Sequence, residues 1–282
     1  MAAMPEIVIT AAGLSQALES SNPPVLLDVR WALGDPDGHL HYLDAHIPGA
    51  VFVDLATELA GHGEPTDGRH PLPRIDDLQE SARRWGIDAG TAVVVYDATG
   101  NMAAARAWWL LRWAGLADVT MLDGGFPAWE REELPVASGE ESARRAGTVT
   151  LSGGHLPVLS ADDAAELSTT GVLLDARAGE RYRGEVEPID PRAGHVPGAV
   201  SAPTSENLVD GLFASPEDLR KRFHTLGVHT GDTVGVYCGS GVTAAHEVAA
   251  LALAGIDAAL FPGSWSAWSS DPARPVATGV EG

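Results

Sequence analysis

The sequence contains very little cysteine and comparatively little positive charge. Cys238 is the only cysteine in 282 residues, which excludes an intramolecular disulfide and any zinc site built from several cysteines. Lysine and arginine number 18 against 39 aspartate and glutamate residues, giving a formal net charge of −21. Because such an acidic surface repels phosphate backbones and anionic headgroups, we expect no nucleic-acid partner and no binding to a membrane.

Long apolar runs and metal-binding patterns are also missing. No stretch approaches the roughly 20 apolar residues that cross a bilayer, and residues 1–10 show no basic segment followed by an apolar one, so we expect a cytoplasmic protein. The ten histidines are scattered without ligand spacing, and we expect no metal and no cofactor. The 45% hydrophobic and 20% charged residues are typical of a globular protein with a core.

The sequence repeats itself at a nearly constant offset of 141 to 149 residues (234 − 93 and 195 − 46). Three segments return in the same order: 25–30 (VLLDVR) as 172–177 (VLLDAR), 46–51 (HIPGAV) as 195–200 (HVPGAV), and 93–96 (VVVY) as 234–237 (VGVY). A length of 282 residues also favours about two domains. We therefore predict an N-terminal domain over 1–137, a linker over 138–155 and a C-terminal domain over 156–282.

Short apolar runs alternate with amphipathic segments in each half. The runs at 172–175 and 234–237 lack the polar alternation of a half-exposed strand, as in strands buried on both faces. Helical patterns cover 76–85, 102–114, 216–226 and 243–254. The alternation predicts an α/β fold with two tandem domains, each a mainly parallel sheet flanked by helices.

The segment around the single cysteine is the most informative. A buried strand is predicted to end at Tyr237, and residues 238–243 (CGSGVT) lead from it into a helix. Ligands of such sheets bind beyond the carboxyl ends of the strands, where glycines let backbone N–H groups point inward and the helix start adds partial positive charge. This cradle should favour a thiolate or a persulfide on Cys238. Its members are Gly239, Gly241, Val242 and Thr243.

The first half keeps this loop without the nucleophile. Aligning Tyr96 with Tyr237 places Asp97 opposite Cys238, so we predict one active site, in the second half. The alternative is that Cys238 is an ordinary buried cysteine, as most lone cysteines are. Its position between a buried strand and a helix start favours a nucleophile.

Three motifs together resemble the tandem-domain rhodaneses, especially the 3-mercaptopyruvate sulfurtransferases, over essentially the whole chain. They are residues 238–243, the duplicated Gly-His-x-Pro-Gly-Ala segment at 194–199 (with Ala45 in place of the glycine in the first half), and 263–268 (GSWSAW). The resemblance implies that Cys238 takes sulfur from a small anionic donor, becomes a persulfide, and passes the sulfur to cyanide, a thiol or thioredoxin. It also implies a relay of Asp54, His70 and Ser240; a plain surface histidine is the alternative for His70.

An anionic donor needs a local cation, and residues 175–184 (DARAGERYRG) supply three arginines. By resemblance Arg181 is the substrate arginine, suited to a carboxylate or sulfonate by its planar fork. Arg177 is a second candidate, but Arg30 takes the same place in the first half, so a structural ion pair is the alternative. Arg183 is the third candidate.

The donor itself stays open at this point. The family's second arginine follows a Pro-Glu-Pro run, whereas 186–192 here reads VEPIDPR, so whether Arg192 replaces it is undecided. Gly239 and Ser240 are neutral, while members that prefer thiosulfate tend to carry cations after the cysteine. A missing unit charge at ~4 Å changes binding by about 1–4 kcal/mol, which favours 3-mercaptopyruvate over thiosulfate.

Other cysteine or serine chemistries fit less well. A phosphatase loop needs an arginine to grip the phosphoryl group, and residues 239–244 contain none. A serine hydrolase elbow needs a glycine two residues before Ser240, where Cys238 stands, and a thioredoxin-like role needs a second cysteine. A non-catalytic rhodanese-like binding or sulfur-relay module remains the rival, because the first half shows that such a domain can lack the nucleophile.

Overall fold

The computed structural model describes residues 6–280 and divides the chain into two compact units. The first contains the residues up to Ala60 together with Pro73–His155. The second contains Gly61–Leu72 together with the residues from Leu156 on. A short segment from the first half of the sequence is thus packed within the second unit, whereas the domain limits of 1–137 and 156–282 stay a prediction.

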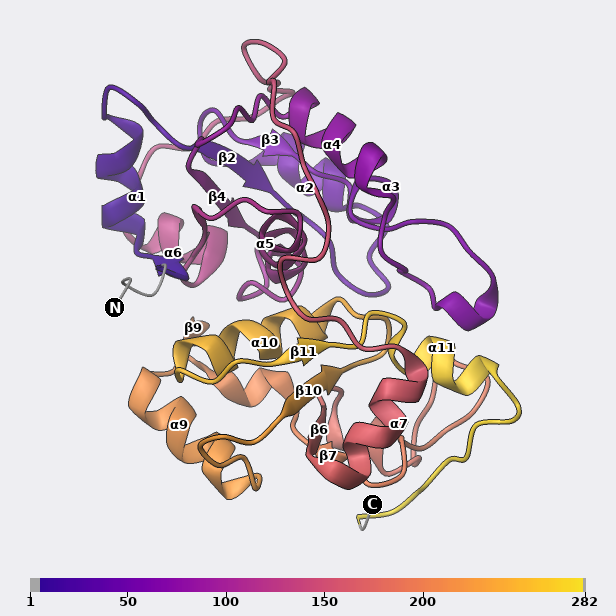
Figure 1. The fold of residues 1–282 in the computed structure, drawn as a ribbon. Coiled ribbons are helices and arrows are strands. Elements are labelled where there is room, and N and C mark those ends of the chain that lie inside the picture. Colours follow the sequence, from indigo (N-terminus) through magenta and orange to yellow (C-terminus); the bar gives the residue numbers. More distant parts are fainter. Residues whose placement is uncertain (1–5, 281–282) are drawn as a thin grey trace. The chain divides into compact units, whose positions relative to one another are not determined.

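The first unit is built on a five-stranded parallel sheet with the strand order β1-β5-β4-β2-β3. Its strands β2, β3 and β4 are labelled in Figure 1. Its strands are β1 (Val8–Ile9), β2 (Val25–Asp28), β3 (Val51–Phe52), β4 (Val93–Tyr96) and β5 (Val119–Leu122). Its helices are α1 (Ala11–Leu18), α2 (Gly38–Asp44), α3 (Leu55–Glu58), α4 (Ile75–Arg84), α5 (Ala104–Trp113) and α6 (Gly125–Arg131).

The second unit repeats this plan with the parallel order β11-β10-β6-β7 and adds a short antiparallel hairpin, β8-β9. Its strands are β6 (Val172–Asp175), β7 (Val200–Ser201), β8 (Leu208–Val209), β9 (Leu212–Phe213), β10 (Val234–Tyr237) and β11 (Ala259–Leu260). Its helices are η1 (Pro65–Asp67), α7 (Ala161–Thr170), α8 (Gly179–Tyr182), η2 (Thr204–Asn207), α9 (Pro216–Thr225), α10 (Thr243–Leu253) and α11 (Ser264–Ser270).

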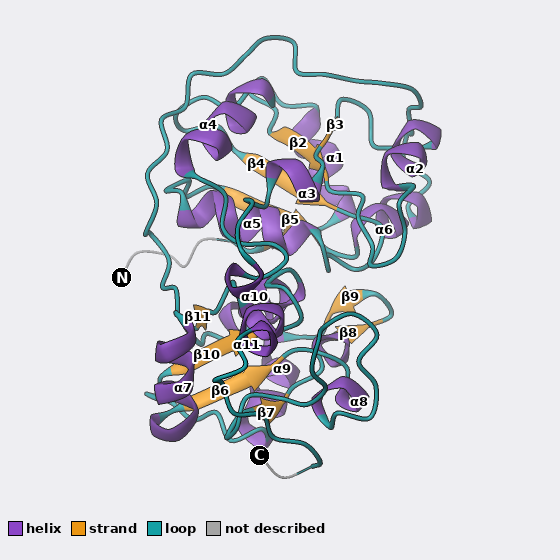
Figure 2. Ribbon diagram, turned by 90° about the vertical axis from the view of Figure 1, so that its right-hand side faces the viewer, coloured by secondary structure: helices purple, strands orange, loops and turns teal. Residues whose placement is uncertain are grey.

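Helices cover both faces of each sheet, which is why the central strands are apolar without alternation (Figure 2). In the second unit α7 and α11 pack on one face, where Leu167, Leu173 and Trp268 meet in one cluster. Helix α10 packs against β10 and β11 and also against α9. The predicted fold class is confirmed, and the four predicted helices are present as α4, α5, α9 and α10.

The helix starts have local causes in the sequence. Ser160 and Asp163 form a capping box at α7, in which each side chain accepts a hydrogen bond from the other residue's backbone N–H. Helix α9 begins with Pro216 after Ser215, whose Oγ accepts a hydrogen bond from the Asp218 N–H. These caps satisfy N–H groups that a helix start would otherwise leave without partners.

The repeated His-x-Pro-Gly-Ala motif is a tight turn that leads into an edge strand. In the second unit Ala199 N–H donates to the Val196 carbonyl at 3.0 Å, with Gly198 at a φ of 81°. Proline followed by glycine at the centre of such a turn is the pattern of type II, where the glycine takes the positive φ. The Tyr237 hydroxyl accepts from Val196 N–H at 3.1 Å and ties this turn to the end of β10.

No helix in the described part of the chain, residues 6–280, is both long and apolar enough to span a bilayer.

Candidate active site

Cys238 lies directly after β10, a central strand of the second sheet, and before α10. Its backbone N–H donates to Ser264 Oγ at 3.1 Å, and that hydroxyl donates to the Phe261 carbonyl at 2.9 Å. Ser264 holds a φ of 54°, a strained value for a residue with a side chain. Ser264 therefore fixes the backbone from which the thiol projects, and Cys238 itself is 2% exposed.

The loop after Cys238 turns back so that Gly241 N–H points at the sulfur, with the nitrogen 3.2 Å from Sγ. Gly241 has a φ of 78°, and a Cβ there would lie 2.5 Å from the Pro262 carbonyl oxygen, so both conformation and space require glycine. Of the other predicted cradle members, Gly239 accepts a hydrogen bond from Ser266 N–H through its carbonyl, Val242 is the N-cap of α10, and Thr243 is its first residue.

The first unit shows what the same loop does with an anion. The Asp97 carboxylate is fully buried and accepts four backbone hydrogen bonds at the start of α5. The donors are the N–H groups of Thr99 (2.8 Å), Asn101 (2.8 Å), Ala103 (2.7 Å) and Ala104 (3.1 Å). Because Asp97 occupies the place of Cys238 in the repeat, this loop geometry is suited to hold negative charge.

Ser240 and His70 are brought together, with His70 Nδ1 2.8 Å from Ser240 Oγ. His70 comes from the segment 61–72, which packs in the second unit, where Arg69 N–H donates to Ser266 Oγ of α11 at 3.1 Å (Figure 1). Asp54 lies in the first unit, where its carboxylate accepts from the N–H groups at the start of α3. Two members of the predicted relay are thus paired, and the part of Asp54 stays a prediction.

Arg181 faces the loop of the thiol. Its Nη1 lies 3.3 Å from the position that a Cβ would take on Gly239, the residue after Cys238. The guanidinium is held by Glu187 at 2.7 Å and by Asp190 at 3.2 Å. With 14% of its side chain exposed, Arg181 is an anchored cation beside the loop that follows Cys238.

Arg177 is placed differently from Arg181. Its side chain is 1% exposed, pairs with Asp175 at 2.6 Å and donates to the Gly194 carbonyl at 2.7 Å. Burial alone would lower the pKa of Arg177, but the carboxylate of Asp175 outweighs burial and raises it. Arg30 repeats the arrangement in the first unit, with Asp28 at 2.8 Å, so the geometry favours the structural ion pair for Arg177.

The other two arginines considered from the sequence, Arg183 and Arg192, also have partners. Arg183 pairs with Glu185 at 2.8 Å and is one-third exposed. Arg192 donates to carbonyl groups around the C-terminal end of α11, among them those of Trp268 and Ser269, each at 2.8 Å. Arg192 thereby satisfies the carbonyls that a helix end leaves open.

Four residues of this site were not predicted from the sequence: Arg69, Glu187, Asp190 and Ser264. The Nη2 of Arg69 lies 3.2 Å from the Cβ position of Gly239, close to the Arg181 guanidinium. Two signals for these residues were present in the sequence. Arg69 directly precedes His70, and aligning 124–129 (GGFPAW) with 263–268 (GSWSAW) places Ser264 opposite Gly125.

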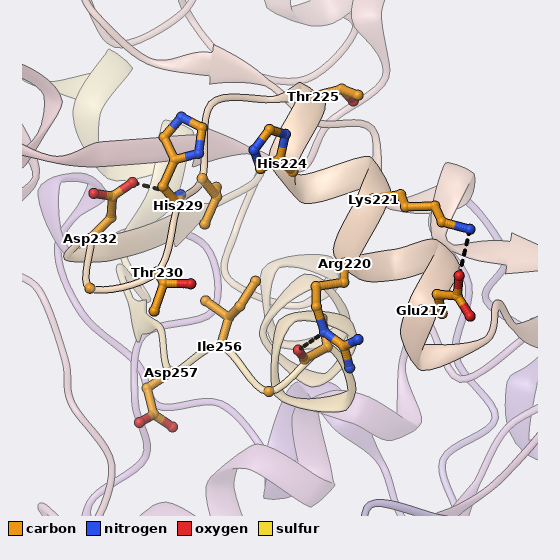
Figure 3. A pocket seen from close by; sticks show the side chains of 14 residues that line it. Glu217, Arg220, Lys221, His224, Thr225, His229, Thr230, Asp232, Ile256 and Asp257 are labelled. Atoms are coloured by element: carbon orange, nitrogen blue, oxygen red, sulfur yellow. Dashed lines mark hydrogen bonds and ion pairs between the residues drawn. The ribbon is translucent and has the colours of Figure 1, made fainter.

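A cavity of about 900 Å³ lies elsewhere in the second unit, between α9 and the turns at 228–232 and 254–257 (Figure 3). Among its lining side chains, the His224 and His229 rings meet edge to face with centroids 4.7 Å apart. This cavity is at the amino end of β10, whereas Cys238 follows the carboxyl end, roughly 13 Å along the strand. Among the described residues no group of three histidine, cysteine or acidic side chains could hold a metal ion.

Comparison with known proteins gives one consistent family. The model of the rhodanese-like domain matches residues 10–132 and 160–271. A Mycobacterium tuberculosis protein, provisionally named thiosulfate sulfurtransferase SseB, is 48% identical over 99% of this chain and 100% of its own length. A Pseudomonas aeruginosa protein, provisionally named 3-mercaptopyruvate sulfurtransferase, is 46% identical over 96% of this chain and 98% of its own.

A solved structure agrees with these relatives. The crystal structure of SseA from Escherichia coli, described as a 3-mercaptopyruvate sulfotransferase with the rhodanese fold, superposes with a TM-score of 0.82 at 32% identity. The match covers 92% of this chain and 99% of SseA. This chain belongs to the family of sulfurtransferases with two tandem rhodanese-like domains.

Proposed function

We propose that this protein moves a sulfane sulfur from 3-mercaptopyruvate or thiosulfate, through a persulfide on Cys238, to a thiophilic acceptor such as cyanide, a thiol or thioredoxin. One observation carries the proposal: the loop that holds the Asp97 carboxylate with four N–H groups in one repeat holds Cys238 at the same place in the other, where Gly241 N–H points at the sulfur. A persulfide extends one sulfur beyond Sγ, so its terminal anion would reach the donors that a carboxylate oxygen uses.

The proposed reaction has two steps, transfer of sulfur to Cys238 and transfer from Cys238 to the acceptor. The Cys238 thiolate attacks the sulfur of 3-mercaptopyruvate, a sulfur–sulfur bond forms, and the carbon–sulfur bond breaks. The electron pair of that bond leaves on the three-carbon fragment as the enolate of pyruvate, which then takes a proton. Attack of cyanide on the outer sulfur afterwards yields thiocyanate and restores the thiolate.

The neighbouring side chains have separate parts in this scheme. Arg181 binds the donor's carboxylate, because its anchored guanidinium faces the loop. The Ser240 hydroxyl, paired with His70, donates to the donor's carbonyl oxygen, where negative charge develops as the enolate forms. Asp54 is retained as a proposed third member of the relay, and the proposed location is cytoplasmic.

The preferred donor in this proposal is 3-mercaptopyruvate. Gly239 and Ser240 bring no positive charge next to Cys238, which disfavours a doubly charged donor. The names of the relatives do not distinguish the two donors. The relative at 48% identity is named for thiosulfate, and the relative at 46% identity is named for 3-mercaptopyruvate.

A second candidate is a non-catalytic sulfur-relay or binding module, favoured by the 2% exposure of Cys238. Intact-mass spectrometry separates the two. After incubation with each donor we expect a gain of about 32 Da that cyanide removes, and no gain in Cys238→Ser. If neither donor adds this mass to folded protein, the catalytic proposal is wrong.

A further inference from the structure

Two arginines from distant parts of the sequence meet at the residue that follows Cys238. Measured to the Cβ position of Gly239, Arg69 Nη2 lies at 3.2 Å and Arg181 Nη1 at 3.3 Å. Arg69 is anchored through its backbone, which donates to Ser266 Oγ at 3.1 Å. With 29% of its side chain exposed, Arg69 is less enclosed than Arg181, and its guanidinium is available to a small ligand beside the loop.

One carboxylate joins the two arginines. Asp190 forms an ion pair with Arg69 through Oδ1 and with Arg181 through Oδ2. It is 3% exposed, as is Glu187, which holds Arg181 from the other side. Two cations beside Gly239 are therefore balanced by two buried carboxylates, so these four side chains together carry little net charge.

We propose that Arg69 binds the sulfur donor together with Arg181, and that Asp190 makes the site select singly charged donors over doubly charged ones. This inference rests on the proposed function. A fixed carboxylate repels a dianion about twice as strongly as a monoanion at the same distance, because the Coulomb energy is proportional to the charge of the ligand. Asp190 thus lowers the affinity for thiosulfate more than that for 3-mercaptopyruvate.

The test compares kcat/KM for both donors in the wild type and in Asp190→Asn, which keeps one acceptor oxygen and removes the charge. We expect the ratio of thiosulfate to 3-mercaptopyruvate activity to rise about tenfold, the change that ~1.4 kcal/mol produces. Glu217→Gln is the matched control, since it removes the same charge from the exposed surface of α9 and should leave the ratio unchanged. An Asp190→Asn ratio within twofold of the wild type would overturn the inference.

A second measurement does not depend on sulfur transfer. Iodoacetate is a monoanion and iodoacetamide is neutral, so the ratio of their alkylation rates at Cys238 reports the local charge. We expect this ratio to rise about tenfold in Asp190→Asn and to fall about tenfold in Arg69→Met, with Arg69→Lys close to the wild type.

The two measurements separate the possible failures. If the wild type forms no persulfide, the proposed function is wrong. The alkylation ratios would still show whether Asp190 and Arg69 determine the local charge at the Cys238 thiol. If Arg69→Met slows both reagents equally, Arg69 has only a structural role and the assignment is wrong. If it raises KM for both donors and leaves the iodoacetamide rate unchanged, Arg69 is a donor-binding residue.

Discussion

At the scale of single residues, the two copies of one loop differ in the side chain that they hold. In the first unit the loop surrounds the side chain of Asp97, whose carboxylate accepts hydrogen bonds from four backbone N–H groups. In the second unit Cys238 occupies that position, and Gly241 N–H turns to its sulfur. A carboxylate is inert toward sulfur donors, so in the proposed mechanism this single difference confines the chemistry to the second unit.

Asp97→Ala tests the cost of leaving those donors without an acceptor. Each buried group that loses its partner costs about 1–3 kcal/mol, so we expect a loss of at least about 3 kcal/mol in the free energy of unfolding. The measurement is the urea midpoint of the unfolding transition. Asp97→Asn should lose clearly less, because its remaining oxygen still accepts. Equal losses in the two variants would mean that the loop does not depend on these hydrogen bonds.

Gly241→Ala tests the shape of the catalytic loop. The φ of 78° costs a residue with a Cβ about 1–2 kcal/mol, and the new atom would collide with the Pro262 carbonyl. We expect persulfide formation to fall at least about tenfold, with a lower melting temperature. Gly255→Ala is the matched control, because Gly255 has a φ of 79° but no atom within 4 Å of its Cβ position. If both variants lose activity equally, the clash is not what matters.

Arg181→Ala tests the proposed role of Arg181 in binding the carboxylate of the donor. Removing an anchored guanidinium from the donor's path takes away ground-state binding, so KM for 3-mercaptopyruvate should rise about 10- to 100-fold, with a smaller change in kcat. The readout is steady-state kinetics with cyanide as the acceptor. Unchanged kinetics would place the donor's carboxylate elsewhere.

At the scale of elements, α10 joins the catalytic loop to a buried polar network. Glu247 of this helix accepts from Asn207 Nδ2 at 2.6 Å and pairs with Arg222 of α9 at 3.2 Å. One residue earlier, His246 Nδ1 lies 2.7 Å from Thr204 Oγ1. These contacts connect α10 to η2 and α9, so they hold the helix whose first turn follows the thiol loop.

Glu247 should make the stability of this element depend on pH. Burial raises the pKa of Glu247 above its ordinary 4.5, only partly offset by Arg222. An acid with a raised pKa in the folded state binds its proton more tightly there. Its contribution to the free energy of unfolding is therefore fully present below about pH 4.5 and is lost as the pH rises through the folded-state pKa.

Glu247→Gln removes this titration. Relative to the wild type, we therefore expect its free energy of unfolding to improve steadily as the pH is raised from about 4.5 to about 7.5. The comparison uses urea unfolding of both proteins across that range. The exposed Glu217→Gln should show no such trend, and parallel curves for Glu247→Gln and the wild type would disprove the assignment.

The internal repeat of the sequence determines how much of the arrangement of helices, strands and site residues could be predicted from the sequence. Motifs that both halves share, such as 46–51 and 195–200, revealed the duplicated α/β fold and the loop at Cys238. Arg69 and Asp190 have no counterparts that the repeat could reveal, and they meet only because the chain brings positions 121 residues apart into contact. Periodicity and local motifs contain no information about such contacts, so the second cation of the site required the structure.

At the scale of the whole molecule, the dominant feature is a net charge of −21 carried by 282 residues. Self-repulsion among so many like charges destabilises a compact state. At 0.1 M, dissolved salt largely screens the repulsion between exposed charges that lie more than about 10 Å apart, while buried pairs such as Arg177 with Asp175 are screened much less.

Salt should therefore stabilise this protein near neutral pH. Raising NaCl from about 0.02 to about 0.3 M at pH 7 should increase the melting temperature by about 2 °C or more, the shift that ~1 kcal/mol produces in a chain of this size. The same addition close to the isoelectric point of 4.6 should have a much smaller effect, because little net charge remains to be screened. An equal rise at both pH values would show that the salt acts through apolar burial and that the acidic surface contributes no measurable strain.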